Sequence, residues 1–329
     1  MYTRLLPVFF GAILLAVFFS LTPCARAAQI PPFFINSVVA LGGERPISVP
    51  GLPDHTEWQT AGTGFFYGYL VQNDPDQSKR RYEIYLVTAK HVIQGYIAAT
   101  HGDIKVRINP KDSSTAIQEF SIPNIPKPDE SSWFYDPDST IDIAITSINF
   151  DFLKGLGYEP NFFPNDSAVL EKKTLIESEV AAGDGVFVLG FPMNLTGAQR
   201  NYVIVRQGVI ARIAEMLEGA SKSFMVDSFV FPGNSGGPVV LRPEIFGIQG
   251  TKTHNNAALI GVVTDYRPYT DVAVSPQTNH ARVLFEENSG LADVLPINYV
   301  EETIRAWRKS RGLPDPDTTS SLPNTDAKH

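Results

Sequence analysis

The sequence predicts an all-β protein made of two barrels or sandwiches, with one helix near its C-terminal end. The chain has 329 residues with 25 glycines, 25 prolines and 11% aromatic residues, a composition that favours many short strands separated by turns. Runs rich in Val, Ile, Tyr and Phe recur along the chain, and these residues fit a pleated, half-buried surface. A hydrophobic fraction of 43% excludes wholesale disorder.

The first 27 residues have the features of a secretory signal peptide. A positively charged start precedes an uncharged apolar run at 8–21, and residues 25–27 (Ala-Arg-Ala) match a small-x-small cleavage site. We therefore expect cleavage near Ala27 and export of the mature chain. One alternative is an uncleaved membrane anchor, for which the apolar run is short. Another is a lipid anchor on Cys24, which the preceding Pro23 disfavours.

Removal of this segment changes the chemistry that the mature chain can use. The loss of Arg4 and Arg26 takes the net charge from −8 to −10, whereas a strong nucleic-acid binder carries a basic surface. Cys24, the one cysteine of the chain, is also lost. We therefore expect no disulfide, no thiol nucleophile and no thiolate metal site. This favours a bacterial protein, secreted or periplasmic, over an animal one.

Strand-like runs follow one another through the first part of the mature chain. We assign the first β unit to residues 34–165, because the runs there are bounded by clusters of turn residues. The stretch 150–178 is less regular and forms the expected crossing to a second unit. The predicted strands of the first unit lie at 35–41, 64–70, 82–87, 104–108 and 141–145.

The second part repeats this pattern and ends in a helix. We assign the second β unit to residues 175–292, the helix to 296–311 and a disordered tail, rich in Pro, Asp, Ser and Thr, to 312–329. The predicted strands lie at 185–189, 202–206, 224–227, 238–241 and 259–263. Apolar side chains recur on one face of the helix, at Ile297, Val300, Ile304 and Trp307.

The segment 231–238, Phe-Pro-Gly-Asn-Ser-Gly-Gly-Pro, gives the sharpest indication of chemistry. Glycine permits backbone conformations that other residues avoid, so a tight turn here can present the Ser235 hydroxyl beside exposed backbone N–H groups. Such groups can form an oxyanion hole, in which the loss of one donor costs about 3–4 kcal/mol of barrier. A lone turn of this kind is more often structural, so the serine needs partners elsewhere in the chain.

A serine nucleophile needs a base, and the base needs an orienting carboxylate. His91, after the apolar strand at 82–87, is the candidate base; the alternative is a satisfied core histidine. Asp142 lies in the apolar run 141–145, where an unpaired buried charge is costly and calls for a partner. The alternative is an edge-strand aspartate that faces water. The three residues are far apart in sequence, so only folding can bring them together.

Together these motifs resemble the chymotrypsin-like (trypsin-like) serine peptidases. Their order is Thr-Ala-Lys-His at 88–91, Asp-Ile-Ala-Ile at 142–145 and Gly-Asn-Ser-Gly-Gly-Pro at 233–238. The sequence is most similar to the bacterial, disulfide-free branch that includes the HtrA/Deg catalytic domains. Too few residues follow the helix for a PDZ domain, so regulation through such a domain is not expected.

The resemblance implies two six-stranded antiparallel β-barrels, with the site in the cleft between them and a C-terminal helix. It implies that Ser235 attacks a peptide carbonyl, that His91 transfers the proton and that Asp142 orients His91. The N–H groups of Gly233 and Ser235 would hold the oxyanion. Activity would be lost below the pKa of His91, expected at about 6–7, and neither a metal nor another cofactor is implied.

Departures from the family pattern concern activation and specificity. Asn234 replaces the aspartate that digestive members pair with a new N-terminus, so activation by such an ion pair is not expected. Phe229 stands where a trypsin-like pocket carries a carboxylate, so the preferred residue before the scissile bond is expected to be apolar or small. Thr264 and Tyr266 are expected to bind substrate together with Phe229.

The predicted function is an exported serine endopeptidase that acts on protein or peptide substrates through an acyl-enzyme. One alternative is a catalytically silent homologue that binds peptides or partners in the cleft. A second alternative is an esterase on the same fold. Neither nucleic acid as a partner nor a membrane span in the mature chain is expected.

Overall fold

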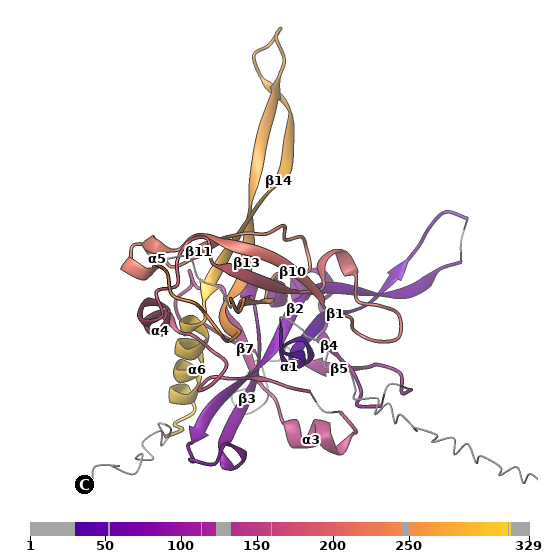
Figure 1. Ribbon diagram of the computed structural model, residues 1–329. Helices are drawn as coiled ribbons and strands as arrows, with labels where there is room; N and C mark the ends of the chain where they lie inside the picture. Colours follow the sequence, from indigo (N-terminus) through magenta and orange to yellow (C-terminus); the bar gives the residue numbers. More distant parts are fainter. Residues whose placement is uncertain are drawn as a thin grey trace, which may run out of the picture.

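The computed structural model describes residues 30–51, 53–112, 114–122, 133–158, 160–244, 250–314 and 316. The predicted signal peptide and most of the predicted tail lie outside these residues. Within them, the strands form two sheets, one from each half of the chain, and helix α6 (Asn298–Ser310) follows the second sheet (Figure 1). No helix in this part of the chain is long and apolar enough to cross a membrane.

The first sheet contains eight strands. Their hydrogen-bonded order is β5-β4-β1-β2-β3-β7-β6, and β8 adds to β2 in the parallel direction. Within the described residues the two end strands, β5 and β6, do not pair with each other, so the sheet is a half-barrel. The strands are β1 (Val38–Ile47), β2 (His55–Gln72), β3 (Arg81–Thr88), β4 (Ile104–Ile108), β5 (Gln118–Ile122), β6 (Phe134–Tyr135), β7 (Ala144–Ser147) and β8 (Phe163–Pro164).

The second sheet is a closed barrel of six strands, in the order β10-β11-β14-β13-β12-β9. Every pair in it is antiparallel. The prediction of an all-β protein with two β units and a C-terminal helix is therefore confirmed, although the first unit has eight strands instead of six. The strands are β9 (Gly185–Gly190), β10 (Ile204–Arg212), β11 (Phe224–Asp227), β12 (Pro238–Leu241), β13 (Ala258–Val274) and β14 (Ala281–Pro296).

Short helices fill the connections between strands. The longest of them, α2, follows β3 directly and buries Val92, Ile93 and Tyr96 against the first sheet. The sequence pattern did not predict it, because Gly95 and the β-branched residues lower its helix propensity, and burial of this face stabilises it instead. The helices are α1 (Pro32–Asn36), η1 (Gln77–Lys79), α2 (Lys90–Thr100), α3 (Phe150–Gly155), α4 (Lys172–Glu177), η2 (Pro192–Asn194) and α5 (Ala214–Glu218).

The two halves share one hydrophobic core. Buried residues of the first sheet, such as Phe65 and Tyr67, belong to the same packed cluster as Leu189 and Val262 of the second and Ile304 of α6. A continuous core across the boundary fixes the position of one sheet against the other. Side chains that stand at the boundary are therefore held in a defined geometry.

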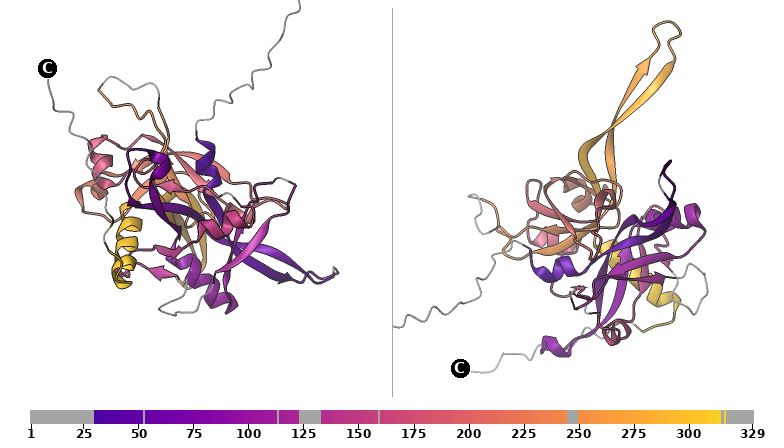
Figure 2. Two further views of the ribbon diagram at one scale, coloured as in Figure 1. Left: turned by 90° about the horizontal axis from the view of Figure 1, so that it is seen from below. Right: turned by 90° about the vertical axis from the view of Figure 1, so that its right-hand side faces the viewer.

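One hairpin extends far beyond the barrel. β13 and β14 continue past the barrel as a pair whose register runs from Pro268 opposite Asn288 to Val274 opposite Ala281. The sequence predicted only a five-residue strand at 259–263. Figures 1 and 2 show this ribbon projecting away from both sheets. Residues 267–289 are called the arm below.

Candidate active site

His91 and Asp142 contact each other at two points. His91 lies in the first turn of α2, directly after β3. Its Nδ1 is 2.6 Å from Oδ2 of Asp142, and its backbone N–H donates to Oδ1 of the same carboxylate at 2.9 Å. Both carboxylate oxygens are thus engaged by one residue, which fixes the imidazole ring relative to the carboxylate.

The position of Asp142 differs from the prediction. Asp142 does not lie inside a strand, because β7 begins two residues later, at Ala144. Its neighbours Ile141 and Ile143 are buried, and this apolar pattern imitates a strand. The loop is held by Lys90, whose Nζ donates to the carbonyls of Ser139 and Ile141, both at 2.9 Å. Lys90 therefore has a positioning role that its place in the sequence did not reveal.

The electrostatics of the pair favour a proton on the ring. The His91 side chain is 50% exposed and that of Asp142 is 26% exposed. Burial alone would lower the pKa of His91, but the hydrogen bond and charge of Asp142, with a smaller contribution from Asp265, raise it above 6.5. An ionised carboxylate only accepts hydrogen bonds, so Nδ1 carries the proton of the neutral ring and Nε2 carries the lone pair.

The turn around Ser235 is pressed against the first sheet. Gly236 has a φ of +82°, and a Cβ there would lie 2.1 Å from Thr88 Oγ1 and 2.9 Å from the backbone nitrogen of Ala89. The carbonyl of Ser235 accepts from the N–H of Thr63 at 2.9 Å. The backbone that carries Ser235 is thus in contact with the segment that leads into His91.

The hydroxyl and the ring are not joined in this arrangement. Within the described ranges, neither the Ser235 hydroxyl nor Nε2 of His91 has a hydrogen-bond partner. The structure therefore brings His91 and Asp142 into direct contact and places the Ser235 turn against Thr88 and Ala89, which precede His91. The serine–histidine hydrogen bond is not formed.

The N–H groups of Gly233 and Ser235 have no acceptor in the described part of the chain. The carbonyl of Pro232 accepts from the Met193 N–H at 2.8 Å, and the carbonyl of Asn234 accepts from the Gly237 N–H at 2.8 Å. In a trans peptide the C=O and N–H point in opposite directions, so the N–H of Gly233 points away from Met193 and the N–H of Ser235 points away from Gly237. Two unpaired donors near Ser235 can stabilise a negatively charged oxygen.

Thr63 connects this turn to the first sheet. Its Oγ1 donates to the carbonyl of Gly233 at 2.6 Å and accepts from the N–H of Phe191 at 3.1 Å. Gly233 has a φ of +102°, and a Cβ there would lie 2.3 Å from the carbonyl oxygen of Phe191. Only glycine fits this position. The sequence pattern gave Thr63 no role.

Asn194 holds η2 against β2. Met193 and Asn194 have φ values of 54° and 60°, a region that residues other than glycine rarely adopt. Asn194 Oδ1 accepts from the N–H and the hydroxyl of Thr60 at 2.8 and 2.9 Å, and its Nδ2 donates to the Trp58 carbonyl at 2.9 Å. Because Met193 in turn binds the Pro232 carbonyl, Asn194 supports the turn that carries Ser235. The sequence pattern did not assign Asn194 to the site.

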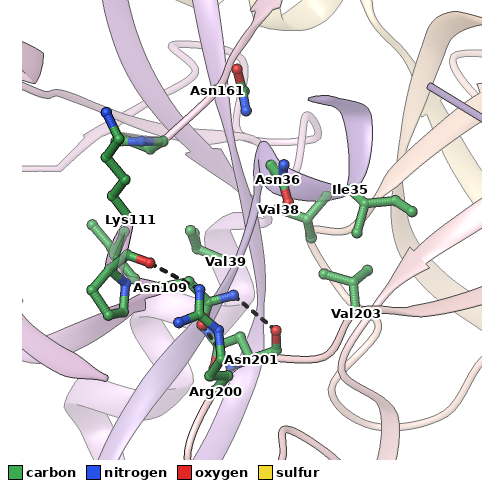
Figure 3. Close-up of a pocket in the computed structure, with 13 residues that line it drawn as sticks. Ile35, Asn36, Val38, Val39, Asn109, Lys111, Asn161, Arg200, Asn201 and Val203 are labelled. Atoms are coloured by element: carbon green, nitrogen blue, oxygen red, sulfur yellow. Dashed lines mark hydrogen bonds between the residues drawn. The ribbon is translucent and has the colours of Figure 1, made fainter. Parts of the chain in front are cut away.

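A cavity of about 300 Å³ lies between the two halves, near the same β9–β10 connection (Figure 3). Arg200 donates to the Pro110 carbonyl at 2.9 Å. Asn201 and Asn109 exchange two hydrogen bonds of 2.8 and 2.9 Å. None of the candidate catalytic residues lines this cavity. It belongs to the polar boundary between the halves, separate from the Ser235 turn.

The three predicted substrate-binding residues lie on segments that adjoin the Ser235 turn. Phe229 is 53% exposed, and its ring stacks on that of Phe231 with centroids 6.5 Å apart. Thr264 follows Val263, which exchanges hydrogen bonds with Gly236 and Gly237. The Tyr266 hydroxyl donates to Glu286 at 2.9 Å. An exposed aromatic ring and an exposed strand edge thus adjoin this turn.

The family model for the trypsin-like peptidase domain matches residues 28–244. Among solved structures, the crystal structure of Deg5 is 18% identical, covers 86% of this chain and 95% of its own, and gives a TM-score of 0.42. No curated protein matches the chain. The residues that the family model matches include His91, Asp142 and Ser235.

Proposed function

Because the chain belongs to the trypsin-like peptidase family, we propose that it is an exported serine endopeptidase that works through an acyl-enzyme. Ser235 is the nucleophile, His91 the base and Asp142 the residue that orients His91. The observation that carries this proposal is the two-point contact between Asp142 and His91, which leaves Nε2 as the basic atom. A proton acceptor held in this way is what a serine hydroxyl requires.

In the proposed reaction these groups act in sequence. Ser235 Oγ attacks the substrate carbonyl and gives its proton to Nε2, and the carbonyl oxygen becomes an oxyanion bound by the N–H groups of Gly233 and Ser235. When the C–N bond breaks, Nε2 returns the proton to the leaving amine. Water then repeats the sequence on the acyl-enzyme, with His91 again as the base. Hydrogen bonds of this kind often tighten only when substrate binds.

The substrate side of the proposal rests on Phe229. An exposed aromatic ring at this position offers an apolar contact and no charge. An apolar or small residue before the scissile bond therefore suits this site better than Lys or Arg. Export follows from the signal peptide expected at residues 1–27, with cleavage near Ala27.

One observation favours a second candidate function. The Ser235 hydroxyl is not hydrogen-bonded to His91, which also fits a silent homologue that binds peptides without cutting them. Labelling of the mature protein with a fluorophosphonate probe separates the two. We expect labelling of the wild type and none of Ser235→Ala. A folded wild type that the probe does not label would support the silent homologue.

Peptidase and esterase activity are distinguished by substrate. A peptide library digested by the mature protein should yield cleavages after apolar or small residues, and none with Ser235→Ala. Hydrolysis of an activated ester with no cleavage of any peptide would establish the esterase alternative instead.

A further inference from the structure

An open strand edge begins next to Ser235. On one side β13 pairs with β14 from Gly261 to Val274, and on the other side it pairs with β12 only up to Val262. Val263 then bonds to Gly236 and Gly237, the residues that follow Ser235. From Thr264 to Val274 the second edge of β13 has no partner strand in the described structure. An unpaired edge can bind another extended chain.

This edge continues onto the arm. The N–H groups of Tyr266 and Val272 donate only locally, to the carboxylates of Asp265 and Asp271, each at 2.8 Å. Such exposed bonds can be exchanged for the carbonyls of an incoming chain. Ten residue steps separate Thr264 from Val274, which corresponds to roughly 33 Å of extended chain.

The arm also exposes apolar side chains to an unusual degree. A two-stranded ribbon alone is marginal in water, and clustered exposed apolar residues mark interaction sites. Figure 1 shows that neither sheet covers this ribbon. The exposed residues are Tyr269 (59%), Val272 (43%), Val274 (50%), Val283 (49%), Leu284 (62%) and Phe285 (53%).

We propose that the arm is an extended substrate-binding site, which pairs with the polypeptide segment that precedes the scissile bond. This inference rests on the proposed function. Because β13 runs from Ser235 towards the tip, an antiparallel partner has its N-terminus at the tip and its reacting carbonyl at Ser235. The substrate class is therefore an extended polypeptide, such as an unfolded protein or a long tail, with about ten residues before the cleaved bond.

The edge suits transient pairing with substrate better than permanent pairing with a second copy. Pro268 lacks an N–H, and aspartates stand at 265 and 271; proline and charge on an edge disfavour stable strand-to-strand association. The arm carries three acidic residues, Asp271, Glu286 and Glu287, against Arg267 and Arg282. A second copy of an acidic protein would bring the same excess charge.

The test compares peptides that share the residues around the cleaved bond and differ in length before it. With six residues before the bond, wild type and an arm-shortened variant should have equal kcat/KM. In this variant Asn-Gly replaces residues 271–285, so that Thr270 and Glu286, which pair across the arm, are joined by a hairpin turn. With twelve residues before the bond, kcat/KM of the wild type should be about tenfold higher than with six. One or two net hydrogen bonds account for an effect of this size. The shortened variant should show no rise.

Two point variants form a matched pair. Val272→Pro removes an N–H from the open edge of β13, and Leu284→Pro changes the residue paired with Val272 on the other strand. We expect Val272→Pro to abolish the rise of kcat/KM with peptide length and Leu284→Pro to retain it. A twelve-residue extension with N-methylated amides should also lose the gain, because its side chains are unchanged but its backbone cannot pair.

The outcomes separate this inference from the proposed function. Equal length dependence in wild type and shortened variant overturns the inference, as does a gain only from residues after the cleaved bond. A wild-type dimer that becomes a monomer on shortening, with unchanged length dependence, identifies the arm as a self-association surface instead. If no peptide is cut, the proposed function fails, and affinities of both peptides for Ser235→Ala, with and without the full arm, decide the inference alone.

Discussion

At the scale of single residues, the carboxylate of Asp142 determines both the orientation and the proton affinity of His91. Its Oδ1 accepts from the backbone and its Oδ2 from the ring, so the ring can neither rotate nor change its tautomer without losing a bond. The same contact raises the pKa of His91 against the effect of burial. The orientation of the His91 ring and its raised pKa are therefore two consequences of one contact.

This contact predicts the pH dependence of peptide cleavage. Only the neutral ring accepts a proton, so kcat/KM should be full at high pH and fall as the pH decreases through a pKa above 6.5. Asp142→Asn removes the charge, so the residual activity should have its midpoint at lower pH. The rate should also fall on the order of 10³–10⁴-fold, because the amide favours the wrong tautomer. The measurement is a pH profile of kcat/KM for both proteins. The same midpoint in the variant and the wild type would contradict this account.

Asn194 provides a second prediction at this scale. Asn194→Ala removes three hydrogen bonds and keeps the left-handed backbone, whereas Asn194→Gly removes the same bonds and relieves the strain. Both should lower kcat more than they raise KM, because they loosen the turn that carries Ser235. Alanine should also cost about 1 kcal/mol more stability than glycine. Kinetics and denaturant unfolding measure the two effects, and a change in KM alone would assign Asn194 to substrate binding.

At the scale of elements, α6 is bound to the first sheet through a buried carboxylate. Glu301 is 3% exposed, accepts from the hydroxyl of Tyr67, and accepts from Asn165 Nδ2 at 2.9 Å. Burial is the main cause that raises the pKa of Glu301 above 4.5, against the two hydrogen bonds that lower it. The helix is thus attached by a group that is more easily ionised in the unfolded chain.

Glu301→Gln tests this attachment through the pH dependence of stability. Since the folded-state pKa is raised, the stability that Glu301 contributes is complete below 4.5 and is lost as the pH rises through the folded pKa. The glutamine variant lacks this loss. As the pH rises, its free energy of unfolding should therefore increase relative to the wild type, by about 1.4 kcal/mol for each pKa unit by which folding raises the pKa of Glu301. Urea unfolding between pH 4 and 8 measures the difference. A constant difference across this range would show that Glu301 ionises alike in both states.

The sequence predicted those strands whose residues are mostly buried. Strands at 104–108, 224–227 and 238–241 coincide with β4, β11 and β12, because each is a short run, mostly buried, between turn residues. The arm escaped prediction because its strands are exposed and mix apolar with charged residues and Pro268, so no burial pattern marks them. His91, Asp142 and Ser235 were predicted from their motifs, and the contact between His91 and Asp142 is present in the structure. Thr63 and Asn194 were not, because their roles depend on contacts between distant segments.

At the scale of the whole molecule, the candidate site exists only where the two halves meet. His91 and Asp142 belong to the first half and the Ser235 turn to the second, and no local sequence signal encodes their approach. The shared core sets the distance between the halves, and polar contacts such as those of Thr63 set the fine position. Damage to such a contact should therefore affect stability and catalysis together.

Thr63→Val tests this coupling with a matched control. The change keeps the shape of the side chain and removes the hydroxyl that bonds Gly233 and Phe191, so unfolding free energy should fall by about 1–3 kcal/mol and kcat should fall with it. Thr146 in β7 is equally buried, at 1% exposure, but its hydroxyl has no partner among the described residues. Thr146→Val should therefore be neutral or stabilising with unchanged kcat. Equal effects of the two substitutions on denaturant unfolding and on kcat would show that the Thr63 hydroxyl does not position the serine turn.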